Sequence, residues 1–340
     1  MKKRLFAMLL AGTMMAGMLT GCGGGATNGG SADGATDSGA ASGGDKKITM
    51  IMALRDEWLS EMEAGAKNNC PSGVSFETQD AQNDAAKQLQ QIEAAKNAGA
   101  SAIIINLVDP ETAGEMKEAA GDLPVVFVNR YPSDPSVLDE NCIYVGSDEH
   151  TSGKFQGEWL AEYFKGKGQN DIKYILLNGT LGQTSTTLRT ESVLKALKDA
   201  GINAAEATAP LACDFDRAKA MDKFTPLIGS TEYDCIISNN DAMALGVVEA
   251  LEQKGIDPAE KPIVGIDASK DGRQGVKDGK LAMSVFQDPV GQGKGAILAA
   301  ANLINGKDIS EGTGYEKDDT GFVLWVPFEP VTAENVADYD

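Results

Sequence analysis

Short apolar runs of strand length alternate with helix-periodic segments along most of the chain after Lys46. Candidate strands are the runs at residues 48–54, 74–78, 101–106, 124–128, 172–177, 235–237, 263–266 and 281–286. The helical segments between and after them include residues 57–69, 84–98, 187–200, 217–228, 242–254 and 292–305. This alternation predicts parallel sheets with helices on both faces, and its two successive runs predict two doubly wound α/β domains.

Polar side chains follow nearly every predicted strand. Ligands of doubly wound domains bind beyond the carboxyl ends of the strands, so these side chains are the candidates for a binding site. They are Asp56, Trp58, Asn129, Arg130, Gln183, Ser185, Arg189, Asn240, Asp267 and Gln287. Their common position predicts one site lined by amide, carboxylate and guanidinium groups.

The chemistry of this set suits a small polyhydroxylated ligand. A sugar hydroxyl donates one hydrogen bond and accepts two, which matches an array of carboxylate, amide and arginine groups. Trp58 offers a flat apolar face on which a sugar ring stacks. Asp56 and Asp241 also stand at helix starts, where an aspartate caps the helix, and the sequence alone leaves that structural role open for both.

Charge and composition exclude several other classes of function. The formal net charge is −20, so the phosphates of a nucleic acid would be repelled. His150 is the single histidine, which leaves little room for histidine-based catalysis or His-rich metal sites. Outside the leader the cysteines are Cys70, Cys142, Cys213 and Cys235, and the sequence does not say whether they are buried thiols or disulfides.

The N-terminus has the pattern of a membrane-targeting leader. Basic residues at positions 2–4 precede an apolar stretch at 5–18, which is short for a membrane span, and Leu19-Thr20-Gly21-Cys22 follows. This end resembles the lipobox of bacterial lipoproteins, which implies cleavage after residue 21 and lipidation of Cys22. Residues 22–45 then hold the lipidated cysteine and a Gly/Ser/Ala-rich linker. We expect an extracytoplasmic protein that is anchored to the cell membrane through Cys22 alone.

Several stretches resemble the periplasmic galactose/glucose-binding proteins. They include residues 80–84, 105–110, 124–129, 144–148 and 239–244, and the similarity extends over residues 46–330. The resemblance implies the type I periplasmic-binding-protein fold, with two doubly wound parallel-sheet lobes joined by a three-strand hinge. The implied crossings lie near Ser147, Gln287 and Gly321. The N-terminal lobe would then comprise residues 46–147 and 287–321, and the C-terminal lobe residues 148–286 and 322–340.

The resemblance also implies roles for individual residues. Asp56, Trp58, Asn129, Arg189, Asn240 and Asp267 match ligand-binding positions of the family. Gln183 and Ser185 stand where the family has a histidine and an aspartate. The second aromatic position of the family aligns with Cys213, and Phe215 is a nearby substitute. Arg130 and Gln287 are more similar to the ribose-binding proteins, so galactose and glucose are in doubt and a pentose or another hexose remains open.

The implied function is that of a solute-binding lipoprotein of an ABC-type sugar transporter. We expect a monomer that binds a monosaccharide, closes about the hinge and docks on the permease of the transporter. Residues 165–171 lack the alternating oxygen ligands of the family's calcium loop, so we expect no metal and no cofactor. A sugar sensor that presents the closed form to a chemoreceptor or sensor kinase is the alternative. A glycosidase would need two flanking carboxylates, and a transcription regulator a basic DNA-binding segment, so neither fits.

Overall fold

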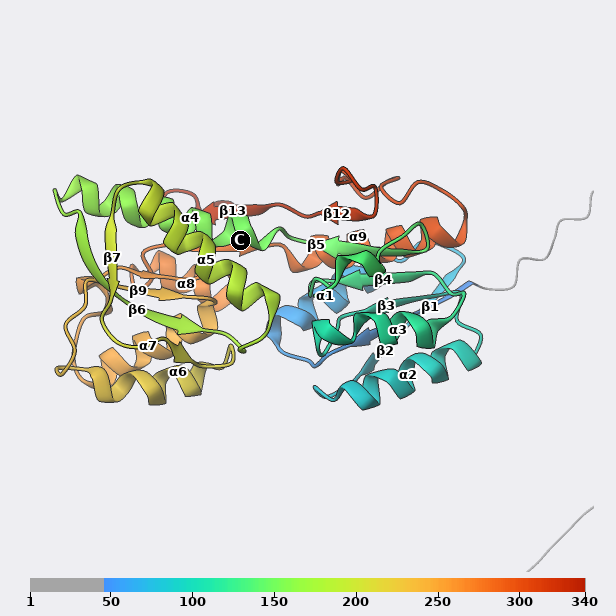
Figure 1. Ribbon diagram of the computed structural model, residues 1–340, viewed down its shortest axis with the longest axis horizontal. Helices are drawn as coiled ribbons and strands as arrows, with labels where there is room; N and C mark the ends of the chain where they lie inside the picture. Colours follow the sequence, from blue (N-terminus) through green and yellow to red (C-terminus); the bar gives the residue numbers. More distant parts are fainter. Residues whose placement is uncertain (1–45, 340) are drawn as a thin grey trace, which may run out of the picture. The chain divides into compact units, whose positions relative to one another are not determined.

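The computed structural model describes residues 46–339, and within this range the chain builds two sheet-centred lobes (Figure 1). The leader, Cys22 and the linker, for which the sequence predicts export and lipidation, lie outside the described residues. The α/β architecture with parallel sheets confirms the fold class that the sequence predicts.

The first lobe is built on a six-stranded parallel sheet with the order β12-β5-β4-β3-β1-β2. Its strands are β1 (Lys46–Met52), β2 (Val74–Asp80), β3 (Ala102–Ile105), β4 (Val125–Val128), β5 (Cys142–Gly146) and β12 (Val323–Trp325). Its helices are α1 (Glu57–Asn68), α2 (Ala85–Asn97), α3 (Ala113–Ala120) and α9 (Pro289–Ile304), with short 3-10 turns at η1 (Pro110–Thr112) and η2 (Pro135–Val137).

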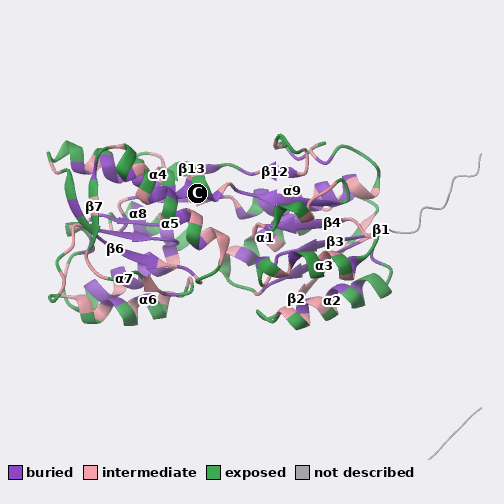
Figure 2. Cartoon of the chain, viewed as in Figure 1, coloured by how far each residue is buried: buried purple, intermediate pink, exposed green. Residues whose placement is uncertain are grey.

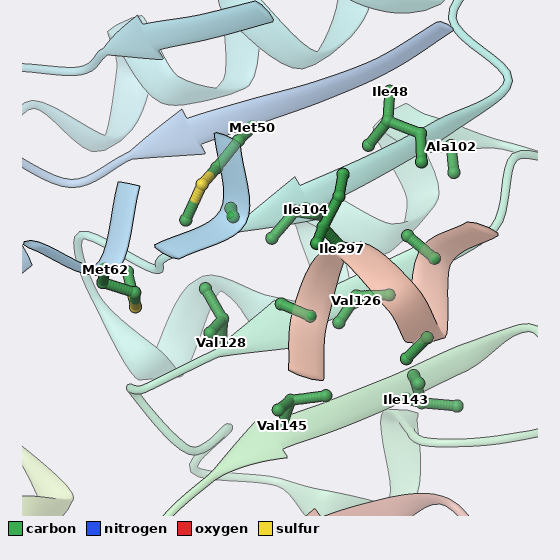
Figure 3. Packing of buried hydrophobic residues seen from close by; sticks show 14 of the residues in the cluster. Ile48, Met50, Met62, Ala102, Ile104, Val126, Val128, Ile143, Val145 and Ile297 are labelled. Atoms are coloured by element: carbon green, nitrogen blue, oxygen red, sulfur yellow. The ribbon is translucent and has the colours of Figure 1, made fainter. Parts of the chain in front are cut away.

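The core of the first lobe explains why its strands read as continuous apolar runs. All residues of β3 and β4 are buried, because helices cover both faces of the sheet (Figure 2). On one face Met50, Ile104 and Val126 pack against Met62 of α1 and Ile297 of α9 (Figure 3). On the other face the buried cluster includes residues of α2 and α3.

The second lobe contains a smaller parallel sheet and an antiparallel strand pair. The parallel strands are β6 (Asp171–Asn178), β7 (Asn203–Glu206), β8 (Leu211–Ala212), β9 (Cys235–Ser238) and β10 (Ile263–Val264). The antiparallel pair is β11 (Ser284–Gln287) with β13 (Phe328–Val331). The helices are α4 (Glu149–Gly166), α5 (Thr184–Asp199), α6 (Arg217–Phe224), α7 (Asp241–Gln253) and α8 (Lys270–Lys277), with turns η3 (Thr225–Leu227), η4 (Pro258–Glu260) and η5 (Val336–Tyr339).

Three segments connect the lobes, and one differs in position from the sequence-based expectation. The first runs from β5 to α4, and the second from β11 to α9. For the third, the sequence predicts a crossing near Gly321, with residues 322–340 in the second lobe. In the structure β12 pairs with β5, so residues 323–325 belong to the first lobe's sheet, and the chain crosses between Trp325 and Phe328. The physical reason is that Val323 and Leu324 are buried side chains that extend this sheet, while Gly321 lies in the preceding turn.

Candidate functional site

The structure brings all eleven candidate side chains to one cleft of about 800 Å³ between the lobes. The first lobe contributes Asp56, Trp58, Asn129 and Arg130; the second contributes Gln183, Ser185, Arg189, Phe215, Asn240 and Asp267; and Gln287 lies at the second connection. The strand order explains this convergence. In each sheet the chain turns back beside its first strand, β1 or β6, which is where doubly wound folds bind ligands.

Helix α1 positions two of the first-lobe residues. Asp56 caps the helix, because its carboxylate accepts a hydrogen bond from the backbone N–H of Leu59 at 2.8 Å. The capping role that the sequence left open is therefore real, and it coexists with a place in the cleft wall. Trp58 donates its indole N–H to the backbone oxygen of Gln287 at 3.1 Å, so the ring is tied to the second connection between the lobes.

The turn after β4 holds Asn129 and Arg130. Asn129 has a positive φ of 67°, and the phenol of Tyr144 donates to its backbone oxygen at 2.7 Å. Arg130 donates through Nη1 to the backbone oxygens of Leu107 and Val108 at 2.8 and 3.0 Å. Burial lowers the pKa of Arg130 to about 10, and the nearby Asp56 carboxylate opposes this effect. The guanidinium is therefore a fixed, charged hydrogen-bond donor in the cleft wall.

Arg189 lies at the centre of the second lobe's wall and is almost fully buried. Its Nε and Nη2 donate to the two carboxylate oxygens of Glu149 at 2.7 and 2.8 Å. Nη1 donates to the backbone oxygen of Asn239 at 2.8 Å, and Nη2 also reaches the Gln287 side chain at 3.3 Å. Its pKa is raised: burial opposes this, but the neighbouring carboxylates outweigh burial.

Asp267 has an exposed edge toward the cleft and an unfavourable environment. The nearest cation is Arg189, whose Nη1 lies 3.7 Å from Oδ1, which is long for a hydrogen bond. Among the described hydrogen bonds, none reaches this carboxylate. Burial raises the pKa of Asp267 well above its usual range; the charge of Arg189 acts against the shift, and Asp241, Asp56 and Glu149 add to it. A ligand hydroxyl that donates to this carboxylate would supply the missing partner.

Asn240, and not Asp241, caps α7. The side-chain oxygen of Asn240 accepts from the backbone N–H of Met243 at 3.0 Å. Asp241 is buried one residue further on, where it accepts from the hydroxyl of Ser284 at 2.6 Å and from the backbone N–H of Ser269 at 2.9 Å. Asp241 therefore does not have the capping role that the sequence left open, and this residue instead joins the start of α7 to β11 and to the loop before α8.

Phe215 supplies the aromatic side chain of the second lobe. It lines the cleft, while Cys213 is fully buried beneath and donates its thiol to the Leu211 backbone oxygen at 3.3 Å. The Phe215 ring packs directly on Gly179, where an added Cβ would come within 2.0 Å of the ring. Only glycine leaves room for this ring. Cys213, Cys70, Cys142 and Cys235 are all free thiols.

Sequence reasoning missed Glu149, whose carboxylate accepts two hydrogen bonds from Arg189. The signal was present, because Glu149 lies three residues after the end of β5, at the start of α4, and so obeys the same strand-end rule as the predicted residues. The carboxylate beside Arg189 comes from the start of α4, while Gln183 and Ser185 lie at the start of α5. Asn83, Asp109, Asp214 and Lys219 also line the cleft and were not predicted.

Two structural features are absent from residues 46–339. No helix in this range is long and apolar enough to cross a membrane. In the same part of the chain, no group of three or more His, Cys, Asp or Glu side chains has the arrangement of a metal site.

Comparison with known proteins assigns the chain to a family. Residues 48–308 match the periplasmic binding protein domain. A provisionally named rhizopine-binding protein of Rhizobium meliloti is 35% identical over 78% of this chain and 82% of its own length. The D-galactose/methyl-galactoside binding periplasmic protein of Haemophilus influenzae is 33% identical over 84% and 88%. A solute-binding protein structure from Bacillus halodurans with bound myo-inositol is 30% identical, with a TM-score of 0.73 over 87% of this chain and 97% of that one. This chain therefore belongs to the type I periplasmic sugar-binding proteins.

Proposed function

We propose that this protein is the solute-binding component of an ABC-type importer and that it captures one monosaccharide or similar small polyol in the cleft between its lobes. The observation that carries the proposal is the lining of this cleft, in which hydrogen-bonding side chains and two aromatic rings come from both lobes. Relatives named for D-galactose and rhizopine binding, and a relative with bound myo-inositol, support a small polyhydroxylated ligand.

The binding residues divide the work between the lobes. Trp58 and Phe215 offer apolar ring faces, and Asp56, Asn129 and Arg130 face the ligand from the first lobe. Arg189, Asn240 and Asp267 face it from the second, with Gln183 and Ser185 at the entrance to α5 and Gln287 at the hinge. A ligand that contacts both walls binds the closed arrangement better than the open one, so binding shifts the population toward closure.

Transport would then depend on the closed form, which ligand binding stabilises. The closed form would dock on the permease of the transporter, and lipidation of Cys22 would keep the protein at the membrane beside it. In the alternative role, a sensory receptor would recognise the same closed form, and the ligand would occupy the same cleft.

A thermal-shift screen of neutral monosaccharides and cyclitols tests the proposal. The panel includes D-galactose, D-glucose, D-ribose, D-xylose and myo-inositol, with sucrose as a disaccharide for comparison. We expect at least one monosaccharide or cyclitol to stabilise the protein, by about 2.7 kcal/mol at a hundredfold excess over Kd. The proposal fails if no compound of the panel raises the unfolding temperature at millimolar concentration.

A further inference from the structure

Glu149 and Arg189 form a buried ion pair in which both carboxylate oxygens accept hydrogen bonds from the guanidinium. The side chains are 8% and 5% exposed, and both oxygens of the carboxylate accept from the guanidinium at 2.7 and 2.8 Å. The two residues come from different helices, α4 and α5, which pack against each other. A two-point contact of this kind fixes the plane of the guanidinium as well as its position.

This pair limits what Arg189 can offer to a ligand. A guanidinium has five N–H donors. Two are used by Glu149, one by the backbone oxygen of Asn239, and the second donor on Nη2 points to Gln287. One N–H remains, on Nη1, the nitrogen nearest to the Asp267 carboxylate at 3.7 Å. Arg189 therefore presents a single directed donor beside a carboxylate that has no hydrogen-bond partner.

The pair is also linked to the hinge. Gln287 accepts from Arg189 at 3.3 Å, and its amide lies 3.5 Å from the Glu149 carboxylate. The backbone oxygen of the same residue accepts from the indole of Trp58 in the first lobe. Glu149 itself begins α4, directly after the connection from β5. Contacts thus link the Glu149–Arg189 pair to Gln287 in the second connection, and Gln287 to the Trp58 ring on the opposite wall of the cleft.

We propose that Glu149 is a positioning residue for ligand binding. It holds the Arg189 guanidinium so that the one remaining N–H faces the ligand beside Asp267. It also keeps the guanidinium within hydrogen-bond distance of the hinge residue Gln287. This inference deepens the proposed function and rests on it. Glu149 acts through Arg189, so its effect on affinity must depend on the presence of the arginine.

A double-mutant cycle tests this dependence. Titration calorimetry of the full-length protein with D-galactose, D-ribose and myo-inositol is compared for the wild type, Glu149→Gln, Arg189→Gln and the double variant. Glu149→Gln keeps the side-chain shape and one acceptor oxygen but loses the charge. We expect it to weaken binding of the probe that binds the wild type by about tenfold, and to change affinity by less than about twofold once Arg189 is replaced.

Matched variants separate positioning from general damage. Glu158 lies on the same helix, but its side chain is 53% exposed and forms an ion pair with Lys154 at 3.6 Å, so Glu158→Gln should keep the wild-type affinity. If Glu149→Gln does not fold, Glu149→Asp keeps the charge with a shorter reach and should also weaken binding only when Arg189 is present. The inference is overturned if the Glu149 substitution lowers ligand affinity as much in the Arg189→Gln background as in the wild type. It is also overturned if the Glu149 variants bind with wild-type affinity. Neither result would contradict the proposed function. Absence of binding by the wild type to every compound of the thermal-shift panel overturns the proposed function, and the inference with it.

Discussion

At the scale of single residues, the cleft contains a buried carboxylate, that of Asp267, whose electrostatic environment is unfavourable and which a ligand hydroxyl can stabilise. Asp267 has a φ of 110°, a left-handed conformation that L-residues other than asparagine and aspartate rarely adopt. Its carboxylate is mostly buried, lacks a hydrogen-bond donor among the described residues and lies near three other carboxylates, Asp241, Asp56 and Glu149. The folded protein tolerates this cost because the same carboxylate, left without a partner, is available to bind a hydroxyl.

Replacing Asp267 should therefore separate binding from stability. In Asp267→Asn the ligand loses a charged acceptor, and we expect a loss of about 1–3 kcal/mol in binding free energy. The unliganded variant should be at least as stable as the wild type, because a buried charge is removed and asparagine tolerates the same backbone conformation. Calorimetry and thermal unfolding measure the two quantities. Unchanged affinity, or a large loss of stability without ligand, would contradict the assignment.

Asp241 makes the stability of the protein depend on pH. Burial raises the pKa of Asp241 to about 7, against the hydrogen bonds from Ser284 and Ser269 and the charges of Arg189 and Arg273, which lower it. The effect also runs the other way, because Asp241 adds to the raised pKa of Asp267. In the unfolded chain an aspartate titrates near pH 4. Between about pH 4 and pH 7 the folded state therefore binds a proton that the unfolded state has released, and stability falls as the pH rises through this range.

Denaturant unfolding at several pH values checks this sign. The wild type should lose stability between pH 5 and pH 8, with a contribution from Asp241 on the order of 3 kcal/mol. Asp241→Asn should show a flatter dependence, and Asp257→Asn, an exposed cap of η4, should keep the wild-type slope. An Asp241→Asn variant with a pH dependence as steep as that of the wild type would contradict the raised pKa of Asp241.

At the scale of elements, close helix packing determines where the first-lobe binding residues lie. Helix α1 carries Trp58 and is capped by Asp56, and it packs against α9. A Cβ on Gly293 of α9 would lie 2.0 Å from the backbone oxygen of Met62 and 2.7 Å from the backbone nitrogen of Ala66. These are backbone atoms that cannot rotate away. The glycine therefore sets the distance between the two helices.

Gly293→Ala should push α1 away from α9. We expect a loss of about 1–3 kcal/mol in the free energy of unfolding, as for other overpacked cores, together with weaker ligand binding because Trp58 moves with α1. The control is Gly166→Ala at the end of α4, where an added Cβ meets no atom within 4 Å, so stability should change by no more than about 0.5 kcal/mol. Equal stabilities of the two variants in urea unfolding would contradict this account.

The same scale shows what the sequence could and could not predict. Strands such as β3 and β4 are covered on both faces, so their continuous apolar runs are visible without a structure. Asn129 and Arg130, which follow β4, line the cleft. Helix α8 has a weak apolar signal, because two of its three buried residues are the glycines Gly272 and Gly275 and the third is Val276. Strand β12 has three residues and was assigned to the wrong lobe. The partnership of Glu149 with Arg189 depends on the packing of α4 on α5, which no local pattern specifies.

At the scale of the whole molecule, the two lobes would work as a tethered unit. The acidic net charge of −20 makes adsorption of the protein to anionic lipid by charge unfavourable, so the expected anchor is covalent. Several acyl chains on Cys22 would hold the protein firmly, because each buried CH₂ contributes about 0.8 kcal/mol.

Replacement of Cys22 by serine tests the anchor. After expression in a bacterial host with labelled palmitate, the wild type should carry label and sediment with membranes. Cys22→Ser should carry no label, while Cys70→Ser, which removes a half-buried thiol of the first lobe, should keep it. Label that persists in Cys22→Ser, or is missing from the wild type, would show that the anchor is not at this cysteine.

The most direct test of the account is a crystal structure with the compound that gives the largest thermal shift. The account predicts one bound molecule that is contacted at once from both walls, with its ring against Trp58 and its hydroxyls within hydrogen-bond distance of Arg189 and Asp267. A molecule bound to only one lobe, or at a site outside the cleft, would contradict it.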